Sequence, residues 1–377
     1  MLIMLVVRRQ PLAWRFALRV AMVLVGVYLI TELNFIPLWW MQYDSSRAEP
    51  IFLLGQLLRA VLTALLSEGL VWFLFLLVAE RLSQAQLLGG VRFAYLGSPR
   101  IWLTNSAVQA ILAGIGVAGL HLAYLCLFYQ VSFRFGAWTP LDVPFTNGVV
   151  TPLPFVEPLF YGALPAIQEE IFYRGIALYL LWRVLRQFWL AALWSSALWA
   201  FLHRGYPTEP FYMRGLELLP VGLLFCWIAR RYGILASISA HYTYNALLTA
   251  VVYLQMDAPY LRFSALISAL GVTLLLLPAL WVARRHRQRP SLETVELPAG
   301  AAAPAPMVQE QAVAPYRLLR PADWIVLAVV LGVMMISTLV YQPDQPDERR
   351  KLQVNRQEAI QSGCRVACCK GTSLRGG

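Results

Sequence analysis

Long apolar segments recur along this chain, and they limit its possible folds more than any other feature. A helix needs about 20 apolar residues to cross the hydrocarbon core of a bilayer. The chain has 377 residues, of which 59% are hydrophobic and only 14% charged, as is typical of a polytopic membrane protein. Segments of suitable length and composition cover residues 16–35, 60–78, 107–129, 155–181, 233–256, 263–283 and 324–341.

Two shorter apolar segments, 188–203 and 216–229, are bounded by charge and lie between longer segments. We expect them to form helices that pack inside the bundle and do not face lipid. The sequence therefore predicts an all-α fold, a polytopic transmembrane bundle of about eight or nine helices. No small-residue cleavage site follows the long first segment, so we expect a retained helix there and no cleaved signal peptide.

The positions of the arginines predict an orientation. Short cytoplasmic loops retain positive charge, and every second loop of this chain is basic, with arginines at positions 8, 9, 15, 19, 81, 92, 100, 183, 186, 230, 231, 284, 285, 287 and 289. We expect a multi-pass protein of the cell membrane with a cytoplasmic N-terminus. Contact with anionic lipid headgroups then accounts for the net charge of +11. Because the arginines are scattered among loops, no nucleic-acid partner is expected.

Composition divides the chain into six parts. Residues 1–150 hold the first transmembrane helices, 151–255 a core with the candidate catalytic residues, and 256–289 an eighth helix. Residues 290–322 form an Ala/Pro-rich linker, 323–341 a last helix and 342–377 a polar tail. The tail carries Cys364, Cys368 and Cys369, which allow a disulfide or a thiol-directed modification, although a disordered end is the simpler interpretation.

Three charged residues, Glu169, Glu170 and Arg174, lie inside the apolar segment 155–181. A charge at membrane depth costs about 2.5–3.5 kcal/mol on insertion scales, so such groups usually serve a function. Glu170 and Arg174 are four residues apart and can pair on one helix face, whereas Glu169 points about 100° away. Glu169 is therefore free to act as a general base. The alternative is a structural ion-pair network or a transport pathway.

Two later apolar segments contribute histidines. His203 ends one segment, while His241 and Asn245 are four residues apart on another and share a helix face. Such a pair can donate jointly to the oxyanion of a tetrahedral intermediate, and a histidine beside a glutamate can orient and deprotonate water. A single histidine in an apolar helix is more often a packing residue. The acids Glu68 and Glu157 and also His121 match no such pattern, and we expect pore-lining or packing contacts from them.

These residues form three motifs in sequence order. They are Glu169-Glu170-x-x-x-Arg174 followed by Gly175, then Trp199-x-x-x-His203, then His241-x-x-x-Asn245. The motifs resemble those of the CAAX prenyl protease and bacteriocin-processing (CPBP or Abi) family of intramembrane proteases. The resemblance covers about residues 155–250. One position departs from the family pattern, because Trp199 stands where the family has phenylalanine.

The resemblance implies a glutamic-type intramembrane peptidase that acts on a membrane-associated protein or peptide. Glu169 would activate water with His203, and His241 with Asn245 would form the oxyanion hole. No cofactor is expected, although two histidines and a glutamate could hold zinc even without the His-Glu-x-x-His spacing. The alternative from another class is a membrane transporter or non-proteolytic scaffold that uses the same Glu/His cluster.

Overall fold

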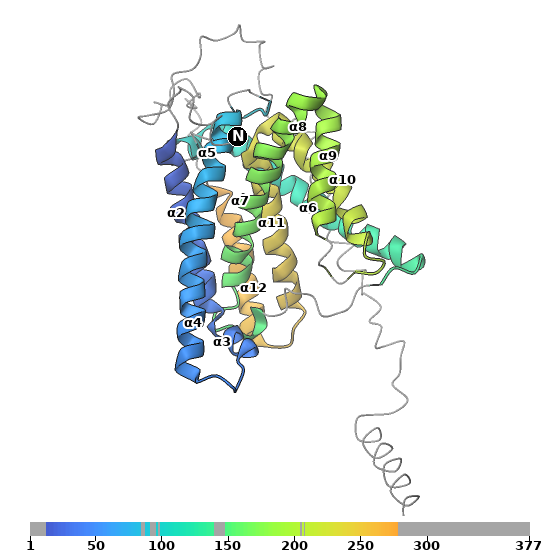
Figure 1. Cartoon of the computed structure of the whole chain (residues 1–377). Coiled ribbons are helices and arrows are strands. Elements are labelled where there is room, and N and C mark those ends of the chain that lie inside the picture. Colours follow the sequence, from blue (N-terminus) through green and yellow to red (C-terminus); the bar gives the residue numbers. More distant parts are fainter. Residues whose placement is uncertain are drawn as a thin grey trace, which may run out of the picture. The chain divides into compact units, whose positions relative to one another are not determined.

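The computed structural model describes residues 13–83, 87–90, 96, 99–138, 148–203, 206 and 208–277 (Figure 1). This part of the chain is helical, and its only β-type pairing is an isolated bridge between Trp138 and Glu209. The predicted all-α bundle is confirmed. The expected linker 290–322, last helix 323–341 and cysteine-bearing tail 342–377 lie outside the described residues.

The described residues form sixteen helical elements. In chain order they are α2 (Trp14–Asn34), α3 (Ile36–Trp39), η1 (Trp40–Gln42), α4 (Glu49–Leu62), η2 (Thr63–Val71), α5 (Trp72–Ser83), η4 (Pro99–Leu103), α6 (Asn105–Arg134), η6 (Glu157–Tyr161), α7 (Ala163–Glu169), η7 (Glu170–Ala177), α8 (Leu178–Leu185), α9 (Phe188–Leu202), α10 (Met213–Tyr232), α11 (Ile234–Leu254) and α12 (Pro259–Leu274).

Three described helices are long and apolar enough to cross a membrane, namely Trp14–Asn34, Glu49–Ser83 and Ser106–Arg134. The second combines α4, η2 and α5, and it is longer at both ends than the expected segment 60–78. The apolar helices α9 and α12 are shorter, and the end of the expected segment 263–283 lies outside the described residues. The helices α10 and α11 have 20 and 21 residues but are not among these three apolar helices, because both carry several polar side chains.

The expected single span 155–181 is built from several pieces. It starts with the π-helical segment η6, turns at Gly162 into α7, and continues through the π-helical segment η7 into α8. Asn34 at the end of α2 holds the chain just before η6 in place. Its side chain donates to the carbonyl of Leu153 and accepts from the N–H of the same residue. π-helical turns inside α-helices are frequent at functional sites. Glu170 and Arg174 both lie in η7.

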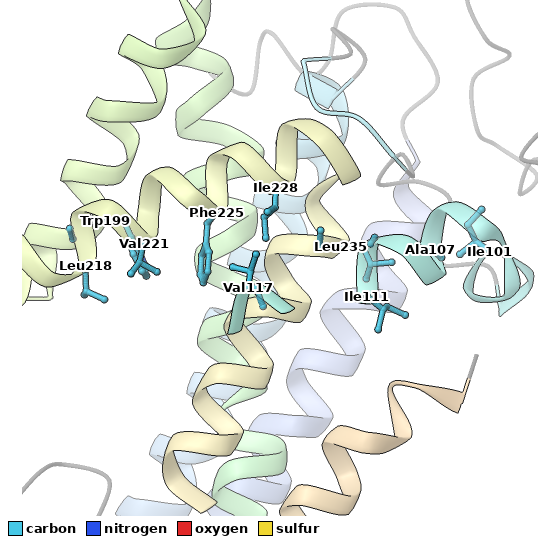
Figure 2. Packing of buried hydrophobic residues seen from close by; sticks show 14 residues of the cluster. Ile101, Ala107, Ile111, Val117, Trp199, Leu218, Val221, Phe225, Ile228 and Leu235 are labelled. Atoms are coloured by element: carbon cyan, nitrogen blue, oxygen red, sulfur yellow. The ribbon is translucent and has the colours of Figure 1, made fainter. Parts of the chain in front are cut away.

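A buried apolar cluster holds the helices that carry the histidines. Figure 2 shows that α10 contributes a row of side chains to this cluster, including Val221, Phe225 and Ile228. The cluster also contains Trp199 of α9, Val117 of α6 and Leu235 of α11. Small residues allow close approach, as membrane helices commonly require. A Cβ on Gly222 of α10, for example, would lie 2.7 Å from the Cβ of Ser196 on α9.

Candidate active site

Glu169 ends α7, and its carboxylate faces two imidazole rings from other helices. Its Oε2 atom lies 3.6 Å from Nε2 of His203, just after α9, and 3.9 Å from Nε2 of His241 on α11. The side chains of Glu169 and His203 are 26% and 18% exposed, whereas that of His241 is only 8% exposed. Three residues far apart in the sequence therefore meet at one carboxylate oxygen that solvent or a substrate can reach.

The predicted pairing of Glu170 with Arg174 is present and completely buried. The Arg174 guanidinium donates to Oε1 of Glu170 over 2.9 Å, and both side chains are 0% exposed. The same Oε1 atom lies 3.0 Å from Nδ1 of His241, a contact that the sequence did not reveal. Glu170 therefore balances the charge of Arg174 and also orients the ring of His241.

Hydrogen-bond partners indicate which ring nitrogens carry hydrogen. Nδ1 of His203 lies 2.7 Å from the carbonyl oxygen of Trp199, which can only accept, so this nitrogen is the donor. Nδ1 of His241 faces the carboxylate of Glu170, which is ionised beside Arg174, and is a donor for the same reason. In its neutral form each histidine then presents an Nε2 lone pair toward Glu169. Three acceptor atoms face one another there, an arrangement that needs a shared proton or a water.

Asn245 lies one turn beyond His241 on α11, as its spacing predicted. One N–H of its side-chain amide donates to the carbonyl oxygen of Gly162 over 3.2 Å, at the bend between η6 and α7. The described contacts of Asn245 do not include Glu169. Its joint donation with His241 toward an oxyanion stays a prediction.

Trp199 is the site residue that sequence reasoning missed. Its indole N–H donates to Oε2 of Glu169 over 2.6 Å, the shortest contact that this carboxylate makes in the described part of the chain. The Arg174 guanidinium lies over the indole ring at 4.6 Å, and the ring of Phe225 lies 5.9 Å away. The departure from phenylalanine at this position was the available signal, because tryptophan adds a donor that phenylalanine lacks.

The remaining intramembrane polar residues make contacts between helices. Glu68 accepts a hydrogen bond from Gln168, Glu157 accepts one from Tyr253 over 2.6 Å, and the ring of His121 stacks on Tyr244 at 3.6 Å. The expectation of packing contacts is consistent with these pairings.

A second buried ion pair, not predicted from the sequence, lies on α10. Arg214 donates to Glu217 over 2.6 Å, and Glu217 also accepts from the hydroxyl of Tyr129 on α6 over 2.8 Å. This pair links α10 to α6. Among the residues that the structure describes, no three histidine, cysteine, aspartate or glutamate side chains are arranged to hold a metal ion.

The helical bundle thus brings together a carboxylate and two imidazole rings, groups that can serve in general acid–base chemistry. Residues 151–247 match the model of the family described as Type II CAAX prenyl endopeptidase Rce1-like, and this match agrees with the resemblance of the three motifs to the CPBP family. The match lies within the expected core 151–255. Comparisons with curated proteins and with solved structures gave no significant match.

Proposed function

We propose that this protein is an intramembrane endopeptidase that hydrolyses a peptide bond of a membrane-associated protein or peptide. The observation that carries the proposal is the single oxygen of Glu169 facing Nε2 of His203 at 3.6 Å and Nε2 of His241 at 3.9 Å. The family match supports the peptidase class, since the matching family is described as a CAAX prenyl endopeptidase.

The distances between these groups suit one water molecule. They exceed the roughly 2.7–3.2 Å of a direct N–H···O hydrogen bond, and polar groups at such a separation are commonly bridged by water. A bridging water would donate one hydrogen to Oε2 of Glu169 and the other to Nε2 of His203, two of the three acceptors that the geometry presents. Glu169 would take the proton as the water oxygen attacks the scissile carbonyl, and would return it to the leaving amine.

Charge on the attacked carbonyl oxygen needs hydrogen-bond donors. For His241 to donate from Nε2, its ring must carry a proton on both nitrogens, and Nδ1 then donates to Oε1 of Glu170, 3.0 Å away. The second amide N–H of Asn245 would complete the oxyanion hole. The buried pair of Glu170 with Arg174 would then be structural support for His241.

The substitution Glu169→Gln tests this function. We expect it to abolish cleavage, because an amide cannot accept the proton, while folding and substrate capture persist. Purified protein would be incubated with membrane fractions, and new peptide termini would be identified by mass spectrometry. Glu157→Gln is the matched control, since this buried acid is bonded to Tyr253 outside the site and its amide can still accept that hydrogen bond. If no variant and no wild-type preparation yields new termini, a transporter or scaffold is the better description.

A metal-free mechanism makes a separate prediction. Stringent chelation of the purified protein should leave cleavage unchanged, since the proposed steps use only side chains and water. The measurement is the cleavage rate before and after dialysis against a strong chelator, with metal content determined in parallel. Loss of activity that added zinc restores would favour a metallopeptidase.

A further inference from the structure

Trp199 touches both members of the proposed acid–base pair. Its indole N–H donates to Oε2 of Glu169 over 2.6 Å, and its backbone carbonyl lies 2.7 Å from Nδ1 of His203. The carboxylate contacts described for Glu169, including those with His203 and His241, all fall on this one oxygen. One residue of α9 thus fixes the position of the base and the tautomer of its partner.

We propose that Trp199 is a positioning residue for the reaction, whose indole N–H holds Oε2 of Glu169 within reach of the two imidazole rings. This inference rests on the proposed function. A carboxylate on a free side chain would rotate among several rotamers, and only some of them face His203 and His241. A donor on a rigid ring selects one of these rotamers before substrate arrives, and such preorganisation supports catalysis.

The surroundings of the indole ring make it rigid. The Trp199 side chain is 2% exposed and belongs to the buried cluster of Figure 2. The Arg174 guanidinium covers the ring at 4.6 Å, and the His241 ring meets it edge-on at 5.8 Å. The hydroxyl of Ser195, one turn earlier on α9, donates to the carbonyl of Tyr173 in η7 over 2.8 Å. The indole N–H cannot turn away from Glu169 without repacking these neighbours.

The substitution Trp199→Phe isolates the hydrogen bond. Phenylalanine keeps an aromatic face for Arg174 and leaves the backbone carbonyl that orients His203, but it has no donor. The chosen probe is a fluorogenic farnesylated peptide that ends in a Cys-a-a-X sequence, cleaved by full-length protein in liposomes. We expect kcat to fall by about 10- to 100-fold, as for a base displaced from its productive geometry, and KM to change less than about twofold.

Trp194→Phe is the matched control, because Trp194 lies on the same helix but is 57% exposed. It should leave kcat unchanged. If Trp199→Phe keeps the wild-type kcat, or if Trp194→Phe loses as much kcat as Trp199→Phe, the role of Trp199 is wrong. The proposed function would still stand in that case, provided that Glu169→Gln is inactive. If the wild-type protein cleaves no probe and releases no new termini from membranes, the proposed function fails, and this inference with it.

A spectroscopic measurement keeps the test independent of the folding of Trp199→Phe. The ultraviolet resonance Raman spectrum contains an indole band that reports hydrogen bonding of the N–H group. Removing the acceptor with Glu169→Ala should shift that band in the difference spectrum against wild type. An unchanged band would show that the indole and the carboxylate are not bonded, and the proposal would be wrong.

Discussion

At the scale of single residues, buried charge is the main feature of this site. Glu170 and Arg174 are both fully buried, and the oxygen that joins them also contacts Nδ1 of His241. Taking two charges out of water is costly, and their attraction repays this cost only with good geometry and further hydrogen bonds. The guanidinium meets them in part, through Glu170, through a 3.5 Å contact with the carbonyl of Gly222, and through the rings of Trp199 and Phe225. Nε of Arg174 and Oε2 of Glu170 have no hydrogen-bond partner among the described residues. Removing one partner of this buried pair should therefore cost more stability than removing one partner of an exposed ion pair.

We predict that Arg174→Met destabilises the protein by about 3–5 kcal/mol, because it leaves the Glu170 carboxylate buried and uncompensated. The measurement is the melting temperature in detergent micelles. Arg262→Met is the matched control, since its partner Asp257 is fully exposed and the pair is screened by solvent. The control should melt like the wild-type protein. Equal melting temperatures for all three proteins would contradict the role of the buried pair.

At the scale of helices, small residues decide how closely the elements approach. A Cβ on Gly114 of α6 would lie 2.5 Å from the carbonyl oxygen of Ala236 and 2.7 Å from the Cβ of Ser239, both on α11. The first of these neighbours is backbone, so it cannot move aside as a flexible side chain would. Since α11 also carries His241, the separation of α6 and α11 affects the position of that ring.

We predict that Gly114→Ala destabilises the protein by about 1–3 kcal/mol through overpacking between α6 and α11. Cleavage should also fall, because α11 must shift to accommodate the methyl group. Gly26→Ala on α2 is the matched control, since nothing lies within 4 Å of its added Cβ. Melting temperature and cleavage rate would be measured together for both variants. A Gly114→Ala protein as stable and active as the Gly26→Ala protein would show that this contact yields easily.

At the scale of the whole bundle, basic side chains collect at one end. Arg183 and Arg230 are in the last turns of α8 and α10. The segment 87–90 after α5 contacts both helices, because the N–H of Leu88 lies 3.3 Å from the hydroxyl of Tyr179 and that of Gly89 donates to the carbonyl of Arg230. Figure 1 shows the turn between α8 and α9 at this end and the short α3 at the other. The predicted cytoplasmic side corresponds to the basic end.

Cysteine labelling tests this orientation. In a background with all native cysteines replaced by serine, Ser46→Cys should react with a membrane-impermeant maleimide on intact cells. Gln187→Cys should react only after permeabilisation, because positive residues beside it retain its loop in the cytoplasm. Both positions are exposed in connections between helices, at opposite ends of the bundle. The opposite labelling pattern would invert the topology, and labelling of both from one side would contradict the arrangement of the helices.

The sequence by itself determined the helical class, the helices that carry polar groups, and the pairing of Glu170 with Arg174. Each of these depends on composition or on the periodicity of one helix, which neighbouring residues fix locally. It did not determine that Glu170 contacts His241, or that the indole of Trp199 bonds to Glu169. Those contacts join different helices, and their distances depend on how closely the helices approach and cross. Side-chain packing over the whole bundle sets that approach, so only the tertiary structure decided which atoms meet at Glu169.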